Sequence, residues 1–140
     1  MRRINHCFVV VGDTAYYRPV GQVSFPEVSK LISTALSVCR KNRIRKLLYN
    51  TKGLTGFGVP NTVQRFWFCV QLATNAKEIV VAVVAQEQMI DPDRFGTTVA
   101  RNRGAIADIF SSESDAQNWL FSVGRDVSQD RNTCDLKAGR

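Results

Sequence analysis

Residues that could perform catalysis are few and widely separated in this sequence. His6 stands at the start of an apolar run with no visible partner, so a structural histidine is expected rather than a general base. Asp91 and Asp93 flank Pro92, and paired carboxylates can do acid–base chemistry. Acids at the start of a helix are the more ordinary interpretation, because they complement the helix dipole. We therefore expect no catalytic centre and no enzymatic activity.

The cysteines do not form a pattern that binds metal. They stand at Cys7, Cys39, Cys69 and Cys134, without a CxxC spacing, and the chain holds one histidine. Zinc sites and disulfide frameworks need tighter clusters of ligands. We expect reduced thiols that pack as small apolar side chains, no metal and no cofactor.

Composition limits the classes of partner. At 140 residues the chain has the size of one domain, and its formal net charge is +7. The basic residues cluster beside helix ends, where they complement the helix dipole, so nucleic-acid binding is not expected. No apolar run approaches the ~20 residues that span a bilayer. The expected location is the cytoplasm.

Strands and helices alternate along the chain. Gly12-Asp13 separates two β-rich runs and is typical of a hairpin turn, and Ser24 with Glu27 forms a capping box that starts a helix. The predicted strands are 6–11, 14–20, 45–50, 78–85 and 105–110. The predicted helices are 25–40, 60–75, 92–103 and one that follows Ser112.

This order predicts an α/β domain over residues 1–122, followed by a polar tail at 123–140. Parallel strands joined by right-handed crossovers should build a mixed five-stranded sheet packed with four helices. Only the first hairpin should be antiparallel. The run 79–85 is apolar almost throughout, which predicts a central strand covered on both faces.

The predicted second helix carries apolar residues on more than one side. At 100° per residue, one arc gathers a predicted core face of Val59, Val63, Phe66, Val70 and Ala73. Phe68 and Leu72 then fall on the opposite side, with Trp67 at the boundary. Exposed apolar residues of this kind mark a partner, a dimer contact or an apolar ligand.

Two parts of the sequence resemble the SpoIIAA-like family. The first is the strand 46–50 running into Gly53-Leu54-Thr55-Gly56, and the second is the closing pattern Asn102-Arg103-Gly104 and Trp119-Leu120. This family is related to the STAS domain of anti-anti-sigma factors and shares a fold with lipid-binding Sec14 (CRAL-TRIO) domains. The resemblance covers about residues 5–121 and implies a STAS-like fold.

Anti-anti-sigma factors carry a phosphorylated serine, in an Asp-Ser pair, at the start of the second helix. The equivalent stretch here, 56–60, holds neither residue. The nearby hydroxyls are Thr51, Thr55 and Thr62, which remain the candidate phosphorylation sites. A phosphate near a helix N-terminus would be favoured by the helix dipole.

The sequence thus predicts a non-catalytic regulatory or protein-interaction module. It should bind a protein partner, or a second copy of itself, through the 51–62 loop and the second helix. The alternative, implied by the Sec14 kinship, is a carrier or sensor of an apolar ligand or lipid, or a binder of anionic membrane surfaces. The candidate binding residues are Gly56, Phe57, Arg65, Trp67, Phe68 and Leu72.

Overall fold

Five strands form one mixed sheet in the order β1-β2-β4-β6-β7. The computed structural model describes residues 4–123, apart from the side chains of residues 95 and 96. The strands are β1 (Phe8–Val11), β2 (Thr14–Tyr17), β4 (Lys46–Asn50), β6 (Val80–Val84) and β7 (Ile106–Phe110). β1 pairs antiparallel with β2, and the other neighbours pair in parallel. The predicted sheet is confirmed.

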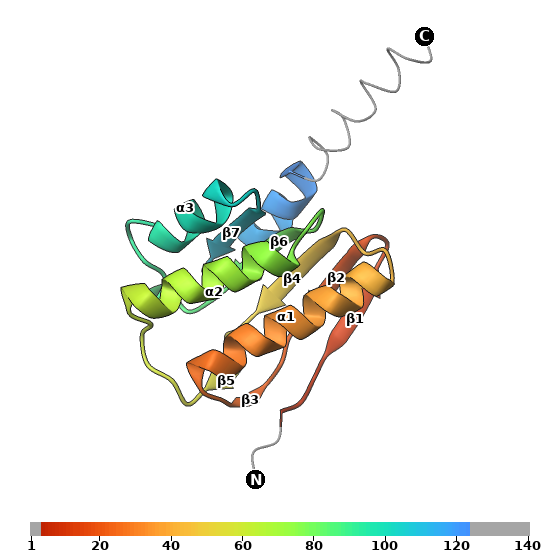
Figure 1. Ribbon diagram of the computed structural model, residues 1–140. Coiled ribbons are helices and arrows are strands. Elements are labelled where there is room, and N and C mark those ends of the chain that lie inside the picture. The colour runs from red at the N-terminus through yellow and green to blue at the C-terminus, as the bar shows by residue number, and fades with distance from the viewer. Residues whose placement is uncertain (1–3, 124–140) are drawn as a thin grey trace.

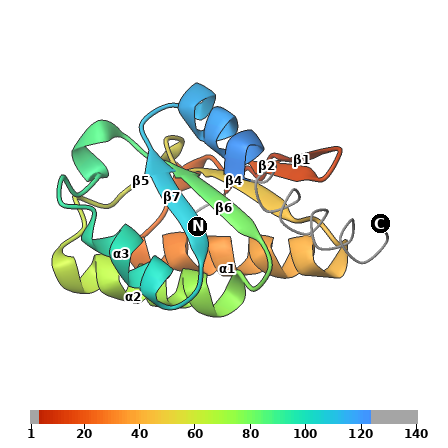
Figure 2. The ribbon, with the colours of Figure 1, turned by 90° about the horizontal axis from the view of Figure 1, so that it is seen from above.

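Helices cover the two faces of this sheet unequally. α1 (Phe25–Lys41), α2 (Thr62–Asn75) and α3 (Phe95–Asn102) lie on one face (Figure 1). Viewed from above, the helical segment 113–123 lies on the opposite face (Figure 2). A short 3₁₀ helix, Glu87–Met89, connects β6 to α3. The four predicted helices are therefore present, and most of the predicted tail lies outside the described residues.

Successive side chains along each strand point to opposite faces of the sheet, so the core has two parts. Tyr49 and Val81 point toward the three-helix face, where they pack with α1 residues such as Ile32. Leu48 and Ala82 point to the other face, where Ala116 and Leu120 cover them. Every residue of β6 is buried, as its continuous apolar sequence predicted.

The sequence predicts the first residue of α1 correctly but not that of α2. Ser24 and Glu27 form the predicted capping box of α1, with each side chain accepting a bond from the other residue's backbone N–H. For α2 the predicted start at Pro60 is wrong. Asn61 caps α2 in a second box with Gln64, so the helix begins two residues after Pro60.

The third helix is shorter than predicted at its N-terminal end. Arg94 adopts a left-handed conformation with φ 53°, so the helical hydrogen bonds begin only after it. α3 ends at Asn102, and Gly104 follows as predicted.

The glycine-rich loop contains an element that the sequence did not predict. Residues Leu54–Thr55 (β5) pair in parallel with Gly21–Gln22 (β3) as a separate two-stranded sheet. Gly56 adopts φ +97°, and a Cβ there would lie 2.8 Å from the Val23 carbonyl oxygen. This close approach and the positive φ both need glycine at this turn.

In the described part of the chain, no helix combines the length and the apolar character that crossing a membrane requires.

Candidate functional site

The predicted helical phase of α2 is wrong. Leu72, expected outside, is 2% exposed, and Phe68 is half-buried against the core. Val59 and Val63, expected inside, are 56% and 64% exposed. α2 is apolar on several sides, so no polar face fixes its rotation from sequence. Val59 also precedes the helix cap, so it is not part of the helix and has no helical phase.

Phe68 and Leu72 instead line a cavity of about 110 Å³. The cavity lies between α2 and α3, beneath the loop that follows β5, and reaches the carboxyl ends of β6 and β7. Its apolar walls are Phe25, Val28, Phe57, Pro60, Phe68, Leu72, Val83, Ala85, Met89, Ala100, Ala107 and Ile109. In open α/β sheets this end of the strands is where ligands characteristically bind.

Aromatic rings build one side of the cavity. Phe25, the first residue of α1, lies 6.0 Å from the ring of Phe57 and 5.9 Å from that of Phe68. Both pairs are tilted or edge-on, the arrangements that the ring quadrupole favours. Three separate segments therefore contribute one aromatic wall.

The polar side chains among the lining residues are bonded to backbone carbonyl oxygens or to other charged side chains. The Arg65 guanidinium donates to the Met89 carbonyl oxygen at 3.0 Å. Arg94 and Arg101 both reach the Asp108 carboxylate, at 2.5 Å and 3.3 Å. The Thr51 hydroxyl donates to the Val84 carbonyl oxygen at 2.8 Å. These bonds fix the polar side chains around an apolar interior.

Cys69 also lines the cavity, on α2. Burial raises the pKa of its thiol to about 11, although Arg65 opposes the shift. The thiol is therefore neutral near pH 7, where a nucleophilic cysteine would need a lowered pKa. Cys69 serves the cavity as a small apolar wall residue.

The structure brings together most of the predicted binding residues. Phe57, Arg65, Phe68 and Leu72 line the one cavity. Gly56 forms the turn before Phe57, whereas Trp67 is exposed on the outer side of α2.

The candidate phosphorylation sites lie in three different settings. Thr51 lines the cavity, and Thr55 is exposed with its hydroxyl 3.4 Å from the Gly21 carbonyl oxygen. Thr62 is the exposed first residue of α2. Their modification remains a prediction.

His6, Cys7 and Cys39 are not among the residues that line the cavity. His6 is exposed, and its Nδ1 lies 2.6 Å from the Tyr17 hydroxyl, a contact that suits a structural role. Cys7 is exposed and Cys39 is buried, while Cys134 lies outside the described residues.

Sequence reasoning missed several wall residues because they come from distant elements. Phe25 stands at a predicted helix start, and the sequence around Met89 and Ala107 carries no signal of a binding site. A usable signal was present: Ile109 and Ala85 stand at the carboxyl ends of predicted parallel strands, where binding sites form in this class of fold.

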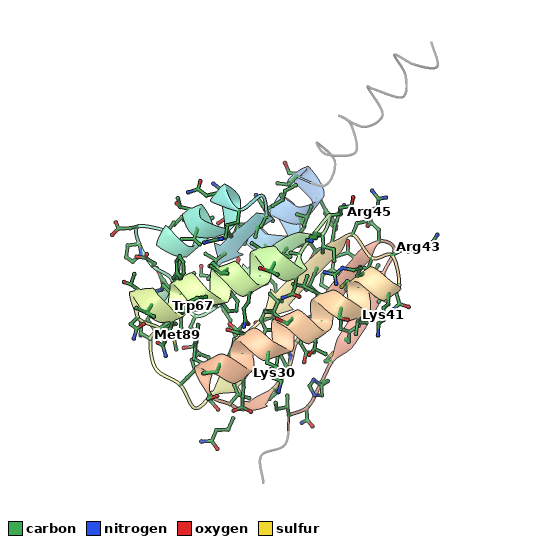
Figure 3. All side chains as sticks on the ribbon, in the orientation of Figure 1. Lys30, Lys41, Arg43, Arg45, Trp67 and Met89 are labelled. Carbon is green, nitrogen blue, oxygen red and sulfur yellow. The ribbon has the colours of Figure 1, made fainter. Side chains whose placement is uncertain are left out.

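Exposed apolar residues lie on the outer side of α2 and in the loop before it. We call Val63 and Trp67 of α2, together with Val59 of that loop, the exposed apolar stripe; Trp67 is 59% exposed. The Trp67 ring packs edge-on against Phe66 at 5.3 Å, and the Arg103 guanidinium lies over Phe66 at 5.7 Å. Figure 3 shows Trp67 on α2, on the side that faces the viewer.

Comparisons with known proteins bear on the fold. No family model matches the sequence, and no curated protein matches it either. An anti-sigma factor antagonist from Mycobacterium paratuberculosis superposes with a TM-score of 0.53 at 11% sequence identity, over 84% of this chain and 94% of that one. The chain has a SpoIIAA-like fold.

A second structure is an uncharacterised protein of the DUF3478 family, with a SpoIIAA-like fold, from Shewanella loihica PV-4. It aligns with a TM-score of 0.43 and 18% identity, over 86% of this chain and 95% of that one.

Proposed function

We propose that this protein is a non-catalytic regulatory module that binds a small apolar ligand in the cavity beneath α2. One observation carries the proposal: Phe57, Arg65, Phe68 and Leu72, which the sequence marked as binding residues, line a single apolar cavity. Binding sites for small molecules are concave and mostly apolar, with a few fixed polar groups.

The size of the cavity indicates the class of ligand. An engineered apolar cavity of about 150 Å³ holds benzene, so 110 Å³ suits a group of about five or six carbons. The buried part of the ligand is then one aromatic ring or a compact branched alkyl group. A polar substituent at the rim would meet Arg65, whose guanidinium has further N–H donors beyond its bond to Met89.

The chemistry of the lining supports binding without catalysis. The Asp108 carboxylate is engaged in ion pairs with both Arg94 and Arg101. The raised pKa of Cys69 argues against nucleophilic attack. A regulatory role agrees with these groups, because it needs only a change in the packing of α2 when the ligand binds.

Thermal unfolding with benzene, indole and isobutylbenzene as probes tests the proposal. A ligand at 100 times its Kd stabilises the folded state by about 2.7 kcal/mol. We therefore expect at least one probe to raise Tm by several degrees. Cys69→Leu should fill the cavity and abolish this rise, whereas Val63→Leu, on the outer side of the same helix, should leave it intact.

The results of these measurements distinguish binding in the cavity from binding elsewhere. If no probe shifts Tm, or if Cys69→Leu retains the full shift, the cavity is not a ligand site. If Val63→Leu removes the shift as completely as Cys69→Leu does, binding takes place on the outer face instead.

A second candidate function is capture of a protein partner through the exposed apolar stripe. Trp67 favours it, because an exposed tryptophan packed against Phe66 and Arg103 resembles the aromatic anchors of interfaces. The double change Val63→Ser, Trp67→Ala should abolish association with such a partner and leave the probe-induced Tm shift unchanged. If the double variant loses both the partner and the probe-induced Tm shift, the two sites are not separate.

A further inference from the structure

The edge strand β1 is unusually apolar and exposed. Val9, Val10 and Val11 are 44%, 48% and 62% exposed. β1 stands at the end of the sheet order, with β2 as its neighbour on one side. In the described residues its other side faces no strand (Figure 2).

The opposite edge of the same sheet is built differently. β7 carries Asp108, whose carboxylate is bonded to Arg94 and Arg101. Charged side chains on an edge strand discourage pairing with another chain. β1 has the sequence Phe-Val-Val-Val and contains neither a charge nor a proline. One edge is protected and the other is open to pairing.

The hydrogen-bond pattern shows which backbone groups of β1 point outward. The Arg18 N–H donates to the Cys7 carbonyl oxygen at 2.8 Å, so Cys7 is a hydrogen-bonded partner of Arg18. In an antiparallel pair this pattern alternates, so Val9 and Val11 also bond toward β2. The N–H and C=O groups of Phe8 and Val10 therefore face the open edge.

We propose that two copies of this chain associate by antiparallel pairing of β1 with β1, about a two-fold axis at Val9. Outward-facing residues must pair with outward-facing residues, so Phe8 of each copy exchanges backbone hydrogen bonds with Val10 of the partner subunit. Val9 then faces Val9 as the non-hydrogen-bonded pair on the axis. An interface of this kind uses the same surface twice and closes the assembly at a dimer.

Side chains beside β1 extend the apolar contact. On the α1 side of the sheet, Phe8 and Val10 line a groove together with Val38 of α1, which is itself exposed. This groove borders the strand that carries the proposed axis, so the dimer would cover more than the strands themselves.

The ends of the paired strands bring no like charges together. In the same register, Asp13 comes opposite Asn5 of the partner subunit and Gly12 comes opposite His6 of the partner subunit, because the two positions of each pair sum to 18, as Val9 with itself does. The Asp13 carboxylate is 60% exposed and lies near Lys46 at 3.8 Å. An acid therefore faces an amide rather than a like charge.

Sedimentation equilibrium of the full chain tests the proposal. We expect a dimer at micromolar concentration. Val9→Lys places two like charges opposite each other on the axis and should weaken the dimer at least about 100-fold, whereas Val63→Lys, at a more exposed valine of α2, should not. A parent chain that stays monomeric at all concentrations overturns the proposal, and so does a dimer that survives Val9→Lys.

Cross-linking tests the register. Non-hydrogen-bonded pairs have Cα atoms about 4.5 Å apart, within the range that a disulfide spans. In a Cys7→Ser background, Val9→Cys should form an intermolecular disulfide under mild oxidation, and Val63→Cys should not. If Val63→Cys cross-links and Val9→Cys does not, the dimer uses α2 and the β1 proposal is wrong. Neither result depends on ligand binding in the cavity.

Discussion

α1 and α2 lie side by side on the same face of the sheet but pack against it to different extents (Figure 1). The fully buried residues of α1 are Val28, Ser29, Ile32, Ala35, Leu36 and Cys39, whereas α2 has Leu72 alone. Both helices are rich in apolar residues, so the difference is one of distance from the sheet. α1 fills its space, and α2 stands off far enough to leave the cavity.

α2 is also held more firmly at one end. Near its C-terminus the Arg40 guanidinium of α1 donates to the Asn75 carbonyl oxygen, and the Asn75 amide lies 3.3 Å from the Ser33 hydroxyl. Leu72, the buried residue, is in the same turn. The N-terminal half carries the cavity residues Arg65 and Phe68. α1 thus serves as a scaffold, and the N-terminal half of α2 is the part that a ligand would displace.

The largest test of this comparison is truncation of one apolar side chain on each helix. Ile32→Ala, in the tight layer under α1, should lower the free energy of unfolding by 2–5 kcal/mol. Phe68→Ala removes a larger side chain but should cost only about 1–2 kcal/mol, because Phe68 is half-buried beside existing space. Urea unfolding measures both. Equal losses would mean that α2 packs as tightly as α1.

Alkaline pH offers a second test, since Cys39 of α1 is buried and Cys69 of α2 is partly buried. Burial raises the pKa of Cys39 and of Cys69 from 9.0 to about 11. The fold therefore favours the neutral thiol, and its contribution to stability is complete below pH 9 and lost as pH rises through about 11. Urea unfolding between pH 8 and 11 should show this fall, and Cys39→Ala should reduce it.

The same cysteines report local opening. At pH 9, alkylation followed by peptide mass spectrometry should find Cys69 reacting faster than Cys39. Opening of α2 exposes Cys69, whereas Cys39 is reached only by global unfolding. Exposed Cys7 is the reference for unhindered reaction. Equal alkylation rates at Cys39 and Cys69 would contradict local opening of α2.

A smaller effect is expected in the turns that follow the two helices. Arg43 after α1 and Glu78 after α2 have φ of 58° and 64°, a left-handed conformation that strains non-glycine residues. Arg43→Gly and Glu78→Gly should each stabilise the protein by about 0.5 kcal/mol, after the extra entropy of glycine in the unfolded chain is subtracted. Tm measurements decide this, and a loss of stability would show that the side chain holds the turn.

The smallest effect concerns the exposed apolar stripe. Val63→Ser should change the free energy of unfolding by no more than about 0.5 kcal/mol, because Val63 is 64% exposed. A loss comparable to that of Ile32→Ala would restore the helical phase first expected from the sequence and remove the cavity from consideration.

The fold was largely predictable because its signals are local. The capping box of α1 and the continuous apolar run of β6 each identify an element without knowledge of the rest. The start of α2 was less predictable, since Pro60 and Asn61 are both acceptable at a helix N-terminus and the side-chain bonds of Gln64 decide between them.

The candidate site was predictable only in part. The sequence predicts Phe68 and Leu72 as outward-facing residues, whereas in the structure both line the cavity. The spacing of apolar residues cannot show which side of a helix faces the core when the helix is apolar on several sides. The remaining walls, such as Phe25 and Ile109, meet only because the sheet order brings the ends of distant segments together.

The segment 113–123 has a consequence for how the chain folds during synthesis. Its Ala116 and Leu120 cover Leu48, Ala82 and their neighbours on the second face of the sheet. A bidentate bond from Arg18 to Glu113, at 2.6 Å and 3.0 Å, ties its first turn to the end of β2. On a translating ribosome this face therefore stays open after all five strands have emerged. During that interval, the nascent chain presents the apolar surface that chaperones recognise.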